Sequence, residues 1–370
     1  MSTPKTFLFV GCCNRQTPYF ASSNGKGIAS FSFDEETGAA SPIETTEGIA
    51  NPTFLSIDAK HQALHANSEV LGWNEGTVSA YAIDPQTGRL RYINKQSSRG
   101  SVAAQNSRDR KGNFLLVANY SMGPETDLPN KAIAVLPIRE DGGLEPAVAD
   151  AVHTGTGPNP DRQERSHPHS VLATPDNRYI VVADLGLDLL ISYRFDPTNG
   201  AISRSGAAAL PPGSGPRHFV FHPNARLAYL VNELTSTVAS FAYDADNGSF
   251  QLLHIEPTIP EAARATNSCS EIQISPGGQN LYVANRGHDS LSIMTLNEDG
   301  GVALNKTVPC GGKTPRHFAI DPSGNFLAVA NQDSDLISVF AIDRQTGDLT
   351  PAGQDIRTGT PTCIAFLRTT

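Results

Sequence analysis

The stretch GPRHFVFHPNARLAYLVNE, residues 215–233, contains two apolar runs joined by a short polar turn. This pattern predicts two antiparallel β-strands. Nearly the same phrase returns as TPRHFAIDPSGNFLAVANQ at residues 314–332, which indicates a fold built from repeats. The repeat also raises a question, because Arg217 and Glu233 place charge at the ends of strongly apolar strands.

Six copies of this strand–turn–strand phrase occur along the chain. They begin at residues 51, 101, 167, 215, 267 and 314. A third strand and often a weaker fourth follow each copy, and a period of roughly 50 residues is typical of the blades of a β-propeller. We therefore predict an all-β chain with four-stranded antiparallel blades.

A seventh blade is predicted from the two ends of the chain. The N-terminal KTFLFVGCC matches the second strand of a copy, and the C-terminal TGTPTCIAFL matches the first. A ring closed in this way has no free edge strands. The expected fold is thus a seven-bladed β-propeller, with residues 1–370 as one domain and one blade closed by strands from both termini.

The composition excludes several classes of protein. The net charge is −9 with no run of basic residues, which argues against nucleic acid as a partner. No apolar stretch is long enough to span a membrane, and the N-terminus does not resemble a secretion signal. The five cysteines include the adjacent Cys12 and Cys13, which suit free thiols better than disulfides. We therefore expect a cytoplasmic protein.

Five phrases carry a resemblance to a known family. They are HPHS (167–170), GPRHFVFHP (215–223), VNE (231–233), SEIQISP (270–276) and YVANRGHDS (282–290). Over nearly its whole length the chain resembles the lactonase family of seven-bladed propellers, which includes bacterial 6-phosphogluconolactonases and the fungal 3-carboxy-cis,cis-muconate cyclase. The resemblance implies the same fold and either lactone hydrolysis or muconate cyclisation.

The alignment of the copies identifies a candidate catalytic site. In antiparallel strands, the start of the first strand and the end of the second lie at the same edge. Several blades have Ala, Thr, Ser, Leu or Cys at these two positions, whereas others have His169, Arg217, Glu233 and Arg286. Because blade geometry does not require these four residues, we predict that they converge on the centre of the ring as a site; solvated rim charges are the alternative.

Further candidates for substrate binding lie at or next to these positions. Glu69 and Arg316 occupy them in other blades. Glu271 begins a buried strand and needs a partner such as Arg286 or Arg316. His218 and His317 each follow an arginine, which leaves open whether they belong to the site or to the packing.

Two other patterns give structural expectations. The long inserts at 14–27, 67–76, 121–130 and 153–166 should rise on the same face as the site. An asparagine recurs at the end of the second strand without regard to blade, so we expect it to be a turn residue that bonds its own backbone. These asparagines are Asn119, Asn232, Asn285 and Asn331.

The candidate residues favour chemistry on a small anion. Guanidinium groups hold carboxylate and phosphate, and a glutamate and a histidine can move protons near neutral pH. No nucleophile is evident, so water or a carboxylate of the substrate would attack. The resemblance implies that His169, Arg217, Glu233 and Arg286 match the histidine, arginines and glutamate proposed for the cyclase.

The function that we expect is a lactonase acting on 6-phosphogluconolactone, with no cofactor. A muconate cyclase, a lactonase for another sugar acid, and a non-enzymatic binding propeller are the alternatives. Glu69, Glu233 and Asn232 offer oxygens to calcium, but the interleaved arginines would repel a cation, so no metal is expected. The expected partner is a small anionic lactone or polycarboxylate, and the protein would be a monomer or homodimer.

Overall fold

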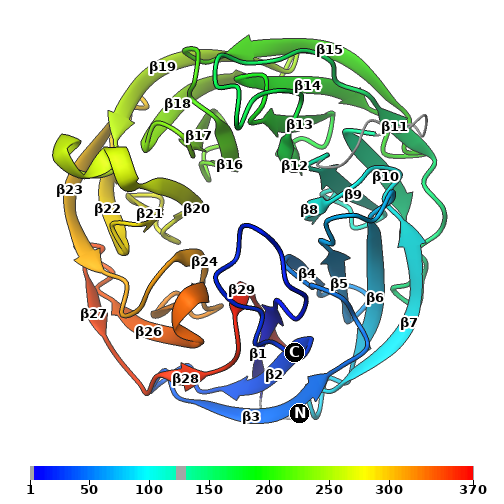
Figure 1. Ribbon diagram of the computed structural model, residues 1–370, viewed down its shortest axis with the longest axis vertical. Coiled ribbons are helices and arrows are strands. Elements are labelled where there is room, and N and C mark those ends of the chain that lie inside the picture. The colour runs from blue at the N-terminus through cyan, green and yellow to red at the C-terminus, as the bar shows by residue number, and fades with distance from the viewer. Residues whose placement is uncertain (1–3, 122–130, 370) are drawn as a thin grey trace.

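The β-strands of this chain form a ring of sheets. A computed structural model describes residues 4–121 and 131–369. In these residues the strands make seven sheets around a common centre (Figure 1), and each sheet runs from an innermost strand to an outer edge. The predicted seven-bladed, all-β propeller is thereby confirmed.

We number the blades I to VII around the ring and give their strands from the centre outward. Blade I has β29 (Pro361–Arg368), β1 (Thr6–Cys12), β2 (Ile28–Phe33) and β3 (Ala40–Thr46), and blade II has β4 (Leu55–Asp58), β5 (Ala63–Ser68), β6 (Thr77–Ile83) and β7 (Leu90–Ser97). Blade III has β8 (Ala103–Arg108), β9 (Phe114–Asn119), β10 (Ile133–Pro137) and β11 (Ala149–Ala151), and blade IV has β12 (Pro168–Ala173), β13 (Tyr179–Asp184), β14 (Leu189–Phe195) and β15 (Ile202–Ala209).

The other three blades follow in chain order. Blade V has β16 (Pro216–Phe221), β17 (Leu227–Asn232), β18 (Thr237–Asp244) and β19 (Ser249–Pro257), and blade VI has β20 (Ser268–Ile274), β21 (Asn280–Arg286), β22 (Ser290–Leu296) and β23 (Val302–Pro309). Blade VII has β24 (Pro315–Ile320), β25 (Phe326–Asn331), β26 (Leu336–Ile342), and two short edge strands on β26, β27 (Leu349–Pro351) and β28 (Ile356–Arg357). The described residues also form two 3₁₀ helices, η1 (Glu261–Thr266) and η2 (Gln332–Ser334).

Blade I closes the ring with strands from both ends of the chain. β29 pairs antiparallel with β1, so that Thr6 lies opposite Arg368 and Gly11 lies opposite Cys363. The two termini therefore meet in one blade (Figure 1). The predicted closure is confirmed.

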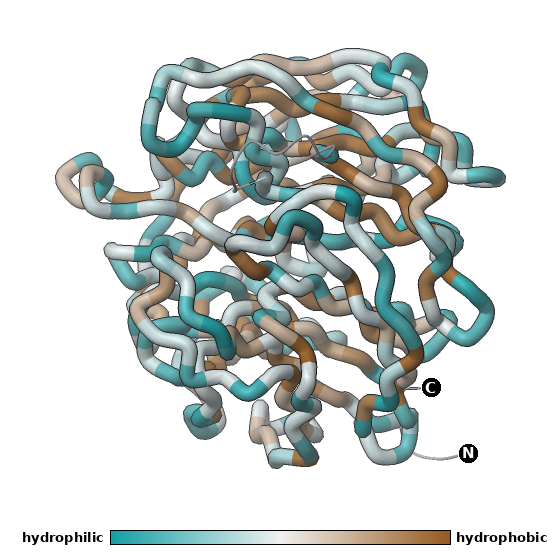
Figure 2. The backbone as a smooth tube through the Cα atoms, turned by 45° about the vertical axis from the view of Figure 1, so that its right-hand side comes forward, coloured by the Kyte–Doolittle hydropathy of each residue, from teal (hydrophilic) through white to brown (hydrophobic). Residues whose placement is uncertain are grey.

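The hydrophobic core lies between neighbouring blades. Strands β1, β5 and β9 are buried along their whole length, whereas the outer strand β3 is partly exposed and the outer strand β15 is largely exposed. One core cluster joins blade I to blade VII through Leu8, Phe31, Phe326 and Val339. In Figure 2 the hydrophobic stretches run mostly along strands in the body of the molecule, and many of the protruding turns are hydrophilic.

The recurring asparagines are buried and donate hydrogen bonds to neighbouring segments of the chain. Asn119 donates from Nδ2 to the carbonyl oxygens of Ser98 (2.8 Å) and Lys131 (2.9 Å), and Asn331 donates to that of Cys310 (3.2 Å). Asn285 and Asn232 donate to hydroxyl groups on the next strand, and all four side chains are fully buried. The interpretation as turn residues bonding their own backbone is therefore wrong, because these amides tie the strand end to its neighbours.

Candidate active site

A cavity of about 430 Å³ collects the residues that the repeat alignment singled out. Six of the nine predicted site residues line it: Glu69, His169, Arg217, Glu233, Arg286 and Arg316. They come from five different blades, so the structure brings together residues that are far apart in sequence. A cavity of this size suits a small organic ligand.

A bulge in several inner strands directs side chains into the cavity. The pairing of β16 with β17 shifts register between Pro216 and Phe219, and β12 and β24 shift between Pro168 and Ser170 and between Pro315 and His317. The residues inside these bulges include His169, Arg217 and Arg316. Because a bulge re-aims the side chain next to it, the repeated bulge explains why one aligned position forms the site.

Glu233 lies at the centre of a cluster of three arginines. Arg217 contacts its Oε2 through Nη1, Arg286 reaches the same oxygen from Nη2 at 3.2 Å, and Arg162 reaches Oε1 from Nη2 at 2.7 Å. Burial alone would raise the pKa of Glu233, but the three guanidinium groups hold it well below its ordinary value. Glu233 is therefore ionised at neutral pH.

The arginines themselves are crowded and partly desolvated. Burial, together with the charges of Arg217, Arg316 and Arg162, lowers the pKa of Arg286 to about 9, although Glu233 acts in the opposite direction. Burial likewise lowers the pKa of Arg217. Both remain charged at neutral pH, so the cluster carries more positive than negative charge and suits an anionic ligand.

His169 is a neutral imidazole in this arrangement. Arg217 donates from Nη1 to His169 Nε2, which places the ring proton on Nδ1. Nδ1 is buried and has no hydrogen-bond partner within the described part of the chain. Burial and then the charge of Arg217 keep the pKa of His169 well below its usual range.

Glu69 and Arg316 form a second, looser pair in the same cavity. Thr53 donates from Oγ1 to Glu69 Oε2 at 2.6 Å, and Arg316 Nη2 lies 3.5 Å from the same oxygen. The Arg316 guanidinium stacks 4.7 Å above the ring of Phe20. Tyr19 also lines the cavity, and burial followed by the charge of Glu69 raises the pKa of its phenol.

Three predicted residues lie outside the cavity lining and bond to each other. His218 donates from Nδ1 to Glu271 Oε2 at 2.8 Å, and His317 approaches that oxygen from Nε2 at 3.3 Å. Glu271 therefore pairs with two histidines and not with Arg286 or Arg316, the partners expected from the sequence. Both imidazoles lie edge-on to Phe54, which places the trio in the packed layer beside the cavity.

The repeat alignment did not identify several residues that line the cavity, because they lie in loops outside the aligned strands. Arg162 and Glu164 come from the insert at 153–166, and Pro18 and Tyr19 come from the insert at 14–27. Figure 1 shows the dark-blue segment between β1 and β2 reaching over the centre of the ring. The length of the inserts was the only feature of the sequence that pointed to these lining residues. The inserts 14–27, 67–76 and 153–166 all contribute residues to the cavity, so they lie on the predicted face. Of the insert 121–130, residues 122–130 lie outside the described residues.

The loop that carries Arg162 is fastened at both ends by one buried carboxylate. Asp184 accepts from His153 Nδ1 (2.7 Å), from Ser166 Oγ (2.6 Å) and from the backbone N–H of His167 (2.8 Å). His153 precedes the loop tip and the other two residues follow it. Arg162 then donates to the hydroxyl of Tyr120 at 3.1 Å as well as to Glu233.

His167 also faces the cavity from the end of this loop. Its Nδ1 lies 2.7 Å from the carbonyl oxygen of Tyr120, and its Nε2 lies 3.0 Å from Glu164 Oε2. Both neighbours are hydrogen-bond acceptors, so His167 is held between the Tyr120 backbone and Glu164 of the loop. The imidazole stacks on the Tyr120 ring with 4.4 Å between centroids.

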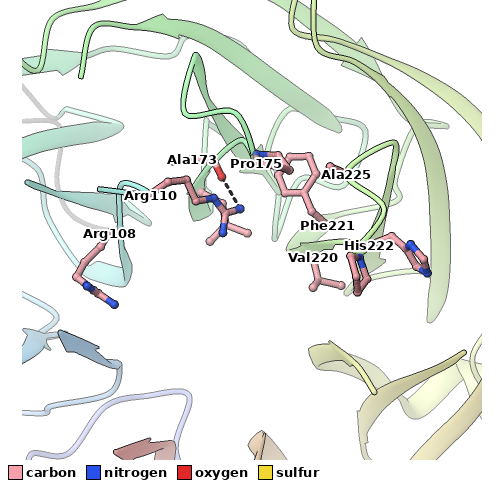
Figure 3. Close-up of a pocket in the computed structure, with 10 residues that line it drawn as sticks. Arg108, Arg110, Ala173, Pro175, Val220, Phe221, His222 and Ala225 are labelled. Atoms are coloured by element: carbon pink, nitrogen blue, oxygen red, sulfur yellow. Dashed lines mark hydrogen bonds between the residues drawn. The ribbon is translucent and has the colours of Figure 1, made fainter. Parts of the chain in front are cut away.

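A second cavity, of about 380 Å³, lies at the opposite ends of the inner strands β8, β12 and β16 (Figure 3). Its two arginines are already engaged by the protein. Arg110 donates from Nη2 to the carbonyl oxygen of Ala173 at 2.8 Å, and Arg108 pairs with Asp58 at 3.0 Å. Among the described residues, no carboxylate lines this cavity and its one histidine, His222, is only partly buried, so we place the site at the Glu233 face.

No metal site or membrane span emerges from the described residues. In residues 4–121 and 131–369, no three His, Cys, Asp or Glu side chains are grouped to hold a metal ion. Within the same ranges, no helix has the length and apolarity needed to cross a bilayer.

The fold and this cavity define a seven-bladed β-propeller with a buried, arginine-rich site at the centre of one face. Residues 7–366 match the family model described as "Lactonase, 7-bladed beta-propeller". The chain therefore belongs to this lactonase family.

Similar proteins agree with this assignment. The 6-phosphogluconolactonase of Bacillus subtilis is 34% identical over 349 residues, covering 94% of this chain and 96% of that protein. The 6-phosphogluconolactonase of Formosa agariphila is 33% identical, with 94% and 96% covered. The solved structure of the periplasmic gluconolactonase PpgL of Pseudomonas aeruginosa superposes with a TM-score of 0.88 at 31% identity, covering 99% of each chain.

Proposed function

We propose that this protein is a lactonase that hydrolyses 6-phosphogluconolactone to 6-phosphogluconate. The observation that carries the proposal is the convergence of Arg162, Arg217 and Arg286 on Glu233 in a cavity of ligand size. Relatives at 33% and 34% identity over 94% of the chain bear the name of this activity, which supports the choice of substrate.

The cavity provides what the reaction needs. A phosphorylated lactone has a phosphate dianion to be held and a ring carbonyl whose oxygen becomes negative when water attacks. Guanidinium groups serve both purposes, because they stay charged and donate paired hydrogen bonds to oxyanions. We assign His169, Arg217, Glu233 and Arg286, with Glu69 and Arg316 opposite them, as the residues around the substrate.

The trio of His218, Glu271 and His317 has a supporting role in this proposal. Burial alone would raise the pKa of Glu271, yet the two histidines keep it below its ordinary value. Because the trio packs beside the cavity without lining it, we infer that it positions the inner strands and does not contact the substrate.

The site is proposed to work without a metal or another cofactor. The carboxylates of the cavity are interleaved with arginines, which would repel a divalent cation. Activity should therefore be the same before and after treatment with a strong chelator. Activity that chelation removes and calcium or zinc restores would show instead that a metal takes part.

We also propose that the protein works in the cytoplasm, as a monomer or homodimer. All five cysteines are free and buried, which suits a reducing compartment. Burial raises the pKa of Cys12 to about 11, so this thiol is protonated and unreactive at neutral pH.

A parallel turnover assay tests the function. The purified protein is given 6-phosphogluconolactone, unphosphorylated glucono-1,5-lactone and 3-carboxy-cis,cis-muconate, and spontaneous hydrolysis is subtracted. We expect the highest kcat/KM with the phosphorylated lactone. Preferred turnover of the muconate would indicate a cyclase, and no turnover of any of the three would contradict the proposal.

A further inference from the structure

The cavity has two parts that differ in charge. The Glu233 part contains one buried carboxylate and three guanidinium groups, from Arg162, Arg217 and Arg286, which gives a net charge of about +2. The Glu69 part contains one carboxylate and one guanidinium group, from Arg316, and is close to neutral. Asp161 and Glu164 also line the cavity, but they are exposed, so solvent screens their charges.

The two parts come from different sectors of the ring. Glu233 and Arg286 belong to blades V and VI, and Arg162 reaches them from the loop between blades III and IV. Glu69 follows β5 in blade II, and Arg316 lies in β24 of blade VII. A substrate with unlike ends can therefore place one end in each part.

The two carboxylates also differ in how freely they can accept a proton. Both oxygens of Glu233 are held by guanidinium groups. The hydrogen bond from Thr53 and the long ion pair with Arg316 both go to Oε2 of Glu69, and the hydroxyl of Tyr19 also bonds to this carboxylate. Glu69 therefore has two neutral hydroxyl partners and one distant guanidinium group, where Glu233 has three guanidinium groups. Arg316 lies beside this carboxylate, where it can donate to an oxygen that becomes negative.

Resting on the proposed function, we propose that the Glu233 part binds the phosphate of the substrate, with Arg162 as the specificity-determining residue, and that Glu69 is the catalytic base. The charge of about +2 matches a phosphate dianion. Arg162 is suited to capture it, because its side chain is 40% exposed and only Nη2 is committed to Glu233 and Tyr120. Arg217 and Arg286 are far more buried and hold the strand ends as well.

The chemical step is then a general-base hydrolysis. Glu69 removes one proton from a water molecule while the water oxygen forms a bond to the lactone carbonyl carbon. The carbonyl oxygen becomes an oxyanion beside Arg316. The tetrahedral intermediate collapses, the bond between this carbon and the ring oxygen breaks, and the proton on Glu69 passes to the ring oxygen. The products are the free hydroxyl and a carboxylic acid, which ionises into solvent.

The first experiment tests the phosphate end with Arg162→Gln. KM for 6-phosphogluconolactone should rise roughly 10- to 100-fold, the worth of a lost charge-assisted hydrogen bond, while kcat/KM for glucono-1,5-lactone changes less than about threefold. Arg99→Gln is the matched control, because Arg99 is 44% exposed and pairs with Asp150 at 2.6 Å away from the cavity. It should leave both substrates unchanged. An equal loss on both lactones in Arg162→Gln would overturn the assignment.

Binding of inorganic phosphate gives a readout that does not depend on turnover. By calorimetry, phosphate should bind the wild-type protein and Glu69→Gln with similar affinity, and Arg162→Gln at least about tenfold more weakly. If Glu69→Gln lost phosphate binding and Arg162→Gln kept it, the phosphate would bind in the Glu69 part, and the proposed orientation of the substrate would be wrong. Wild-type protein that turns over neither lactone would instead contradict the proposed function.

The second experiment tests the base. Glu69→Gln should lower kcat on both lactones by about 10²–10⁴-fold, with KM for the phosphorylated lactone little changed, and should remove the acidic limb of the pH–rate profile. Thr53→Val keeps the carboxylate but removes its hydroxyl partner, so it should stay within about tenfold of wild type. Equal losses in the two variants, or an acidic limb that persists in Glu69→Gln, would show that Glu69 is not the base.

Discussion

The charge of Glu233 links the site to the stability of the fold. Its pKa in the folded protein lies well below the value of 4.5 for an unperturbed glutamate, because three guanidinium groups outweigh the effect of burial. The ionised carboxylate therefore stabilises the folded state. The contribution is complete above the unfolded pKa and is lost as the pH falls through 4.5 toward the folded pKa.

This sign gives a prediction for Glu233→Gln. At pH 7 the variant should be less stable than wild type, because it leaves three guanidinium groups, two of them largely buried, without their carboxylate. The difference in the free energy of unfolding should narrow as the pH falls below 4.5, because the wild-type carboxylate then becomes protonated. Urea denaturation of both proteins between pH 7 and pH 3.5 measures this difference in the free energy of unfolding. A difference that stays constant from pH 7 to pH 3.5 would contradict the linkage.

At the residue scale, the repeats made part of the site predictable. His169, Arg217, Glu233 and Arg286 stood out because they depart from the residues that equivalent positions hold in other blades. Glu271 was assigned the wrong partners, because the bulge between Cys269 and Ile272 turns its side chain toward two histidines. Alignment does not reveal such a bulge, because β12, β16 and β24 carry a bulge at the equivalent place and the copies therefore keep the same spacing.

At the scale of elements, the loop of residues 153–166 depends on Asp184. This fully buried carboxylate accepts three hydrogen bonds from the two ends of the loop. The sequence did not disclose this role, because Asp184 lies in an ordinary apolar strand and its partners are 17, 18 and 31 residues away. The loop length was visible, but the residue that the loop presents to the cavity was not.

Asp184→Asn should loosen this loop while the blades stay folded. Each lost hydrogen bond to the charged group costs about 1.5–3 kcal/mol, so amide exchange across residues 153–166 should accelerate. Because the loop presents Arg162, binding of inorganic phosphate should weaken about tenfold. Asp196→Asn is the control, since Asp196 accepts only local bonds in an exposed turn of the same blade. Unchanged exchange in Asp184→Asn would show that the loop is held by other contacts.

The innermost strand of blade I is the second element whose role can be tested. β29 is buried from Pro361 to Ala365, and its residues join the core clusters toward both neighbouring blades. Its place was predictable because the C-terminal phrase repeats the first strand of every copy. Deletion of residues 358–370 should therefore lower the free energy of unfolding by several kcal/mol, or prevent folding altogether.

A milder pair of variants keeps this prediction measurable. Ile364→Ala, at a position that is 2% exposed, should cost about 2–5 kcal/mol in urea denaturation, whereas Arg368→Ala at the exposed strand end should cost little. A deletion protein with the wild-type urea midpoint would contradict the role of β29 in closure.

At the scale of the whole molecule, the core is shared between blades. Separate clusters join blades I and II, II and III, III and IV, IV and V, V and VI, VI and VII, and VII and I. The repeat period and the matching ends made this ring predictable, because each blade must bury its faces on its neighbours. The path of the loops over the ring was not predictable, since it follows from contacts that no repeat records.

This arrangement leads us to propose that residues 1–370 form one domain, which unfolds in a single transition. A blade that opened alone would expose its faces in two clusters at once, so partial unfolding is costly. The single tryptophan, Trp73, reports on blade II. Its fluorescence and the far-UV circular dichroism of all blades should therefore follow the same urea curve.

A distant core variant makes the test sharper. Val339→Ala lies in the cluster between blades I and VII, at 3% exposure, and should destabilise that cluster by about 1–3 kcal/mol. If the ring is one cooperative unit, the Trp73 curve must shift by as much as the circular dichroism curve, although Trp73 belongs to blade II. Val148→Ala, at an exposed position, should shift neither curve. A Trp73 transition that stays in place while the circular dichroism moves would show that the blades unfold separately, and that the closed ring does not couple them.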